Sequence, residues 1–358
     1  MSTTIIWWQP ALWLGIIVAC YWAYHRVQTE RRYFHSALQS HWLEIKRFWW
    51  PSVLVGIVLS IVTLLSGILL PFKWVMWCEI FISIGLLLSF ISYRLDIWLL
   101  IATLIYVTTT KNNLHATVIA LLLCTIVSII GAALLHWLPT TAYSPELQRT
   151  HRGKLTSLYR LRQFYFVPLF IFVPGNWLHI HLWLCGGDYH VNVIMLPLIF
   201  GFTQLVKQQL PITARERMIV MQIMQAALCL IISGLCWWQP HHLQLLCMIL
   251  VIVMLVAWVI FGYFDHHGDL RFNQVPNGIR VIAVLPHTPA AKMDLHVGDV
   301  IVACNQVPVT NEDEFYYALQ KSPTFCHLRV QDQAGEYRIL ESAIFNDSPY
   351  EIGVVTFK

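Results

Sequence analysis

The residue types most able to do chemistry in this chain are histidine, serine and the acidic residues, but their spacing matches no common catalytic motif. A zinc metalloprotease needs His-Glu-x-x-His, which places two imidazoles and a general base on one helical face, and the sequence contains no such run. The G-x-S-x-G turn of serine hydrolases is also absent. Ser233-Gly234 lies inside an apolar stretch without that frame. We therefore predict no catalytic residues and no enzymatic activity.

Histidine and cysteine side chains could bind a metal ion, and three close histidine pairs stand out. Neighbouring histidines on a helix point in different directions, so one ion cannot easily bind both. The nine cysteines include no C-x-x-C pair and lie mostly inside apolar runs, where they behave as small hydrophobic residues. The sequence therefore predicts neither a metal site nor a cofactor. The three pairs are His179 and His181, His241 and His242, and His266 and His267.

The composition predicts that most of the chain lies in a membrane. Hydrophobic residues make up 57% of the 358 residues and charged residues only 12%, about half of the roughly 25% found in soluble proteins. Nine apolar stretches approach the ~20 residues that cross a bilayer, so we expect a polytopic α-helical membrane domain of about eight or nine spans over residues 1–264. The stretches are 5–24, 52–71, 74–93, 95–109, 116–137, 164–185, 191–206, 218–238 and 243–264.

Basic residues between these stretches predict the orientation. With alternating spans, 14 Lys and Arg fall on one side and 2 on the other, and the basic side of a membrane protein is the cytoplasmic one. The loops 25–50 and 138–164 carry most of them and should face the cytoplasm with everything after residue 264. We expect their basic side chains to lie near anionic lipid headgroups. Six of them are the lipid-proximal candidates, namely Arg26, Arg31, Arg32, Arg149, Arg152 and Lys154.

The last part of the chain has the pattern of a small soluble domain. After a linker over 265–276, residues 277–358 form short alternating runs broken by Gly, Pro and Asn, which predicts strands and turns. Thr310 to Glu314 is a double candidate for a capping box that opens a helix ending at Gln320. Residues 265–358 hold 12 acidic and 7 basic residues, and this excess of negative charge argues against a nucleic-acid partner. We expect a small α+β, partly open barrel.

The run from Val284 to Ile301 resembles the bacterial PDZ signature V-x-P-x-S-P-A-x-x-x-G-L-x-x-G-D-x-I. Two positions depart from the usual pattern, because Asp294 and Gln306 replace glycines. Both positions often take left-handed backbone angles, which Asp tolerates better than Gln. We therefore expect a slightly altered turn at Asn305-Gln306 within an unchanged fold.

Resemblance to PDZ domains implies a peptide-binding groove. Such domains add an extended peptide to an exposed strand edge, and a hydrophobic-Gly-hydrophobic loop receives its carboxylate or a turn. The run Ile352, Gly353, Val354 and Val355 has that form. Phe315 and Leu319, on one face of the predicted helix, either line the opposite wall of the groove or fill the core.

Over the whole chain, a first span, a basic segment from Arg26 to His35, further spans and a PDZ tail together resemble the MinJ family of division-site proteins. This resemblance implies a non-enzymatic scaffold at the septum and poles that links the polar coiled-coil protein DivIVA to the Min ATPase MinD. Its expected partners are these proteins and membrane lipids, and not nucleic acid. Whether it forms a homo-oligomer stays open.

A second class of protein also fits, namely a transporter or channel whose PDZ tail regulates it. Pro168, Pro174 and Pro197 could interrupt helices in the way that transporters use at their binding sites. Against this class, Glu79 and Asp96 lie near the ends of predicted spans, and no span centre holds a clear ionisable residue.

Overall fold

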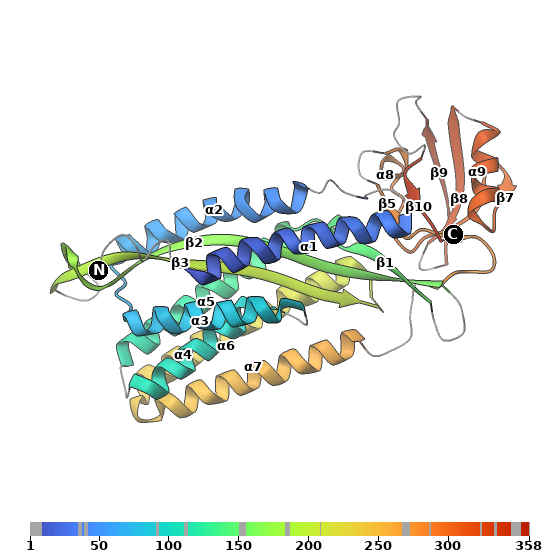
Figure 1. Ribbon diagram of the computed structural model, residues 1–358. Coiled ribbons are helices and arrows are strands. Elements are labelled where there is room, and N and C mark those ends of the chain that lie inside the picture. Colours follow the sequence, from blue (N-terminus) through green and yellow to red (C-terminus); the bar gives the residue numbers. More distant parts are fainter. Residues whose placement is uncertain are drawn as a thin grey trace.

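An elongated N-terminal body and a small C-terminal domain at one end of it make up the computed structural model (Figure 1). The body's helices and two long strands run side by side along its length. The structure describes residues 9–34, 38, 42–90, 93–110, 114–149, 155–182, 187–207, 209–266, 273–285, 288–322, 324–332, 335–344 and 352–357.

Helices form most of the body. They are α1 (Pro10–Phe34), α2 (Trp42–Leu65), α3 (Phe72–Leu87), α4 (Leu95–Thr110), α5 (Leu114–Trp137), α6 (Pro211–Trp238) and α7 (Leu243–His266), with short 3-10 turns η2 (Leu88–Phe90), η3 (Thr140–Ala142) and η4 (Pro240–His242). Within the described residues, five helices are long and apolar enough to cross a membrane, and α4 is a shorter apolar helix. The five are α2, α3 together with η2, α5, α6 and α7 together with η4.

The predicted count of eight or nine helical spans is therefore not confirmed. The stretches 164–185 and 191–206 do not form helices: their described residues lie largely in β2 (Leu155–Leu182) and β3 (Gly187–Val206), a long antiparallel hairpin. β1 (Ser144–Arg149) extends this sheet beside the start of β2.

Proline and strand-forming residues explain why these two stretches are strands. Each proline inside a helix costs about 3 kcal/mol because it lacks an N–H group and its ring clashes with the preceding turn. Pro168 and Pro197 lie directly opposite each other in the hairpin. The neighbouring aromatic and β-branched residues suit a pleated surface. Hydropathy alone does not separate such an apolar strand from an apolar helix.

The outer edge of β2 is covered by hydroxyl groups of α2. Ser60 Oγ donates to Pro168 O at 3.1 Å and accepts from Phe170 N at 3.0 Å. Thr63 Oγ1 donates to Phe170 O at 2.9 Å. Gly56 lets the helix come this close, since a Cβ there would lie 2.7 Å from Pro168 O. The backbone groups that point away from β3 thus find partners inside the protein.

The outer edge of β3 is covered in the same way from two other segments. The Tyr93 hydroxyl donates to Ile199 O at 2.8 Å, and Tyr93 N donates to Thr203 Oγ1 at 2.9 Å. The Gln9 amide donates to Met195 O. Non-helical backbone is tolerated at membrane depth only where protein buries it and satisfies its polar groups. Both edges of the hairpin meet that condition along this stretch.

The small domain contains the elements that the tail sequence predicts. They are β4 (Ile279–Arg280), β5 (Ala283–Val284), α8 (Pro289–Lys292), β6 (Val300–Cys304), β7 (Val307–Pro308), α9 (Glu312–Gln320), β8 (Phe325–Gln331), β9 (Tyr337–Ala343) and β10 (Val354–Val355). One sheet has the order β4-β6-β8-β9 with β7 beside β6, and β10 pairs with β5. A single apolar core, including Val281, Ile301 and Leu328, lies between these strands and the two helices.

One local prediction in this domain is confirmed, while the turn that was expected to be altered at Asn305-Gln306 keeps left-handed backbone angles. Asn311 caps α9 by accepting from Glu314 N at 2.8 Å, and the Glu314 carboxylate accepts from Thr310 N at 2.7 Å, which completes the capping box. Asp294 and Gln306 have positive φ angles of 59° and 66°, and Asn305 has 48°. The pair Asn305-Gln306 forms the two-residue turn between β6 and β7, where both central residues need positive φ.

Ser60 gives a test of the covered edge. We expect Ser60→Ala to destabilise the body by about 1–3 kcal/mol, because it leaves the buried Phe170 N–H without its acceptor. Ser128→Ala is the matched control: Ser128 is also fully buried, but its hydroxyl donates only to Cys124 O of its own helix. Thermal unfolding of the full chain in detergent measures both, and equal losses would contradict the role given to Ser60.

Gln306 gives a test of the left-handed turn. Gln306→Gly should stabilise the C-terminal domain by about 1 kcal/mol, because a Cβ is unfavourable at this backbone conformation. Gln306→Ala keeps the Cβ and should bring no gain. Hydrogen exchange of the amides in β6 and β8 of the full chain measures the local stability. A gain with alanine equal to that with glycine would show that the side chain and not the backbone causes the effect.

Candidate functional site

β10 is a strand edge that can accept another strand. Leu285 N donates to Gly353 O at 2.9 Å and Ile282 N donates to Val355 O at 2.8 Å. Backbone groups alternate in direction along a strand, so the N–H and C=O of Val354 point away from β5. Among the described residues, β5 is the one strand that pairs with β10. An extended peptide could therefore pair with the Val354 side.

A tight turn precedes this edge and depends on Gly353. Its φ is 80°, and a Cβ there would lie 2.3 Å from Thr288 Oγ1. Thr288 is itself held, because its hydroxyl donates to Leu285 O at 2.7 Å. Ala290 N donates to Ile352 O at 3.0 Å, so the turn is fastened to the start of α8. A side chain at Gly353 would therefore disturb the turn itself as well as any ligand.

Phe315 and Leu319 fill the core. Their side chains are 3% and 5% exposed, and they pack in the same cluster as Ile352, which is 2% exposed. Of the two roles left open by the sequence, the structure thus favours the packing one. Val354 and Val355 are partly buried in β10. The six predicted groove residues come from one domain, but three of them, Phe315, Leu319 and Ile352, are buried in its core.

Two aromatic residues that the sequence analysis did not single out border a cavity of about 430 Å³ between the start of α9 and the chain that follows β10. They are Tyr316, 41% exposed on the polar face of α9, and Phe357. An aromatic residue on the otherwise charged face of an amphipathic helix is the signal that could have identified Tyr316. The full lining is Gln274, Gly278, Ile279, Arg280, Thr310, Asn311, Glu312, Asp313, Tyr316 and Phe357. We call this cavity with the outer edge of β10 the candidate groove.

The body contacts the domain at Ile282 and at Gln274, which also belongs to the lining of the candidate groove. The Tyr159 hydroxyl of β2 donates to Ile282 O at 2.8 Å, and Gln274 N donates to Leu155 O at 3.1 Å. A second cavity, of about 570 Å³, lies at this junction and is bordered by the segment from Asp294 to Val297. The lining of the candidate groove includes no residue of the body among those described.

Charges around α9 and β6 support the domain's shape. Hydrogen bonds from the Thr310 side chain and backbone lower the pKa of the Glu314 carboxyl. Asp299 accepts from His296 N and pairs with Arg338, both at 3.0 Å. Burial nevertheless raises the pKa of Asp299. These groups hold loops and a helix end, and of them Thr310 belongs to the lining of the candidate groove.

The predicted lipid-proximal arginines and lysine have different surroundings. The Arg26 guanidinium pairs with Glu30 at 2.8 Å and Glu44 at 2.7 Å, so it joins α1 to α2. Arg31 and Arg32 are exposed in the last turn of α1. The last residue of β1 is Arg149. Arg152 and Lys154 lie outside the described residues.

Asn311 tests how the capping box positions α9 beside the candidate groove. Asn311→Ala should destabilise the domain by about 1 kcal/mol, whereas Asn311→Gly should cost only a few tenths. The Glu314 part of the box is present at neutral pH, and because the folded pKa is lowered, it is lost as the pH falls through that value. Hydrogen exchange of the α9 amides in the full chain measures both effects. Equal losses for alanine and glycine would contradict this account.

Comparison with known proteins agrees with this geometry. Residues 280–331 match the family model of the PDZ domain. The chain is 30% identical to proteins named "Probable cell division topological determinant MinJ" from Lacticaseibacillus paracasei and Lacticaseibacillus casei (strain BD-II), over 96% of this chain and 94% of each relative. It is 24% identical to "Cell division topological determinant MinJ" of Bacillus subtilis (strain 168), over 98% of this chain and 92% of that relative.

Proposed function

Because the chain belongs to the MinJ family of cell division topological determinants, we propose that it is a non-enzymatic membrane scaffold that links a DivIVA-like polar protein to MinD. The apolar helices anchor it in the cell membrane in several passes, and the PDZ domain binds a protein partner in the cytoplasm. The observation that carries the peptide-binding part is the edge of β10, where the N–H and C=O of Val354 point away from β5. Phe357, three residues further on, borders the cavity of the candidate groove.

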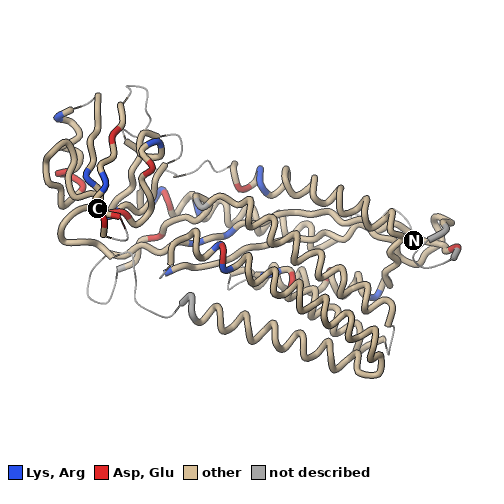
Figure 2. The backbone as a smooth tube through the Cα atoms, turned by 180° about the vertical axis from the view of Figure 1, so that it is seen from behind, with Lys and Arg blue, Asp and Glu red and all other residues tan. Residues whose placement is uncertain are grey.

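The charge distribution supports the cytoplasmic orientation. Figure 2 draws most Lys and Arg of the body close to the end that carries the PDZ domain. Short basic segments stay on the cytoplasmic side of a membrane. The PDZ domain would therefore meet cytoplasmic division proteins and not the cell exterior. Confinement to a surface raises the effective concentration for weak contacts, which suits a scaffold.

The transporter alternative has less support. Asp96 and Gln222 are buried polar residues in the body beside a cavity of about 10 Å³, a volume that holds roughly one water molecule. Asp96 is paired with Arg94 at 2.8 Å. The three prolines that suggested broken helices lie in the β2–β3 hairpin. We therefore propose that the chain acts as a scaffold and not as a transporter.

Val354 tests strand addition. Val354→Pro removes the outward N–H while leaving the bonds that Gly353 and Val355 accept from β5, and proline is tolerated on a strand edge whose N–H faces outward. We expect binding to the DivIVA or MinD homologue of the same cell to weaken about tenfold or more, because a ladder hydrogen bond is lost and the ring blocks close approach. A two-hybrid assay of full-length chains measures it.

The matched control is Val354→Thr, which keeps the N–H group and a β-branched shape. It should bind its partner as the unchanged chain does. Protection of Leu285 N in hydrogen exchange confirms that β5 and β10 still pair in both variants. If the proline and threonine variants bind equally, the groove is elsewhere.

Localisation tests the scaffold as a whole. A fluorescent fusion of the full chain should concentrate at septa and poles, and deletion should produce filaments or minicells because division sites are no longer restricted. Uniform fluorescence around the membrane together with normal division would refute the proposed function.

A further inference from the structure

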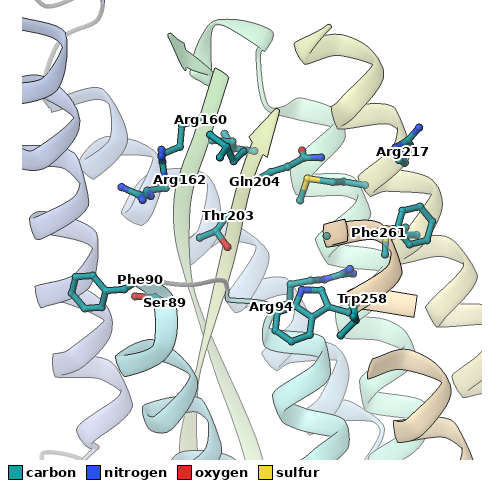
Figure 3. A pocket seen from close by; sticks show the side chains of 16 residues that line it. Ser89, Phe90, Arg94, Arg160, Arg162, Thr203, Gln204, Arg217, Trp258 and Phe261 are labelled. Carbon is teal, nitrogen blue, oxygen red and sulfur yellow. The ribbon is translucent and has the colours of Figure 1, made fainter. Parts of the chain in front are cut away.

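A cavity of about 290 Å³ in the body collects arginines from distant parts of the sequence (Figure 3). Arg94 precedes α4, Arg160 and Arg162 lie on β2, and Arg217 lies on α6. No two of these elements are adjacent in the chain, so the cluster exists only in the folded protein. The remaining lining is Ser89, Phe90, Leu161, Thr203, Gln204, Leu205, Met218, Met221, Trp258, Val259, Phe261 and Gly262.

The charge of this lining is positive. Among the described residues that border the cavity there are four guanidinium groups and no carboxylate. Arg94 and Arg160 pair with Asp96 and Glu146, at 2.8 and 2.7 Å, outside the lining. Arg162 instead lies over the Trp22 ring, with its guanidinium carbon 3.4 Å from the ring centroid. Thr203 and Gln204 add polar groups beside the arginines, so the cavity is suited to an anion with several oxygens.

The other half of the cavity is apolar and opens beside the outer surface of α7. Trp258, Phe261 and the two methionines form this half. Val259 is 63% exposed at the cavity and Ile260 is 46% exposed next to it. In a helix that crosses a membrane, such exposed apolar residues face lipid chains. A ligand with a charged head and an apolar tail fits this division of the lining.

We propose that this cavity binds an anionic phospholipid, with its headgroup in the part lined by arginines and its acyl chains along the exposed face of α7. Arg160 and Arg162 line one side of the cavity and Arg217 the opposite side, with Arg94 between them (Figure 3). Basic pockets between membrane helices on the cytoplasmic side are suited to such headgroups. The cavity is close to the roughly 300 Å³ of the smallest ligand pockets. It therefore accommodates a headgroup while the chains stay in the bilayer. This site differs from the exposed basic turn of α1 and from the candidate groove.

Native mass spectrometry of the full chain in mild detergent tests the proposal. Added dioleoylphosphatidylglycerol should be retained as one molecule per chain, and dioleoylphosphatidylcholine should bind about tenfold more weakly. Glycerol 3-phosphate supplies the same phosphate without acyl chains and should not displace the lipid. Equal retention of the two lipids would overturn the proposal, and so would displacement by glycerol 3-phosphate at the same concentration, because the site would then bind a soluble phosphate.

Two double variants separate a specific site from diffuse charge. Arg162→Gln with Arg217→Gln should weaken phosphatidylglycerol binding about thirtyfold. Arg31→Gln with Arg32→Gln removes the same charge from the exposed last turn of α1 and should weaken it less than about twofold. Equal weakening by the two pairs would mean that binding follows overall charge and would overturn the proposal.

A substitution at an exposed position tests the site without replacing a buried residue on which folding depends. Val259→Trp leaves all four arginines in place but fills the mouth of the cavity from an exposed position, and it should abolish the retained lipid. Val256→Trp, at a residue 51% exposed one turn earlier on α7, is outside the lining and should leave binding unchanged. Retention of the lipid by Val259→Trp would overturn the placement of its chains.

Discussion

The structure depends on satisfying the outer edges of one β-hairpin inside an apolar body. A two-stranded ribbon leaves every second backbone N–H and C=O without a partner, and burying such groups unpaired costs several kcal/mol each where no water is present. Hydroxyl groups of α2 cover one edge, and the side chains of Tyr93 and Gln9 donate to backbone oxygens of the other. The helices beside the hairpin therefore do more than shield it, because specific side chains complete its hydrogen bonding. Their positions along the ribbon are fixed by those bonds.

The same hairpin joins the body to the PDZ domain. The start of β2 holds the segment before β4 through Leu155 and holds Ile282 through Tyr159. Ile282 in turn donates to Val355 of β10. A series of hydrogen bonds thus runs from the start of β2, through the Tyr159 hydroxyl and Ile282, to the strand edge that we propose for peptide binding. These bonds hold the domain at the end of the body.

The two proposed binding sites lie on different parts of the protein. The candidate groove, which we propose for a protein chain, is made of short strands and a capped helix. The arginine cavity, which we propose for a lipid, is made of long elements of the body. The described linings of the two cavities share no residue.

The sequence by itself determined the features whose causes are local. The capping box at Thr310 to Glu314 and the left-handed backbone angles at Asp294 and Gln306 depend on neighbouring residues, and each appears in the structure. The apolar character of residues 1–264 was equally clear, since it needs only composition.

Tertiary structure decided the rest because the deciding partners are far apart in the chain. Residues 164–206 are apolar enough for helices, and only pairing Pro168 with Pro197 under α2 makes them strands. The sequence placed Phe315 and Leu319 on one face of a helix, but it did not show which residues that face packs against. In the structure they share a core with Ile352. The arginine cavity shows the same limit, since residues from 89 to 262 meet there through packing that no short-range pattern records.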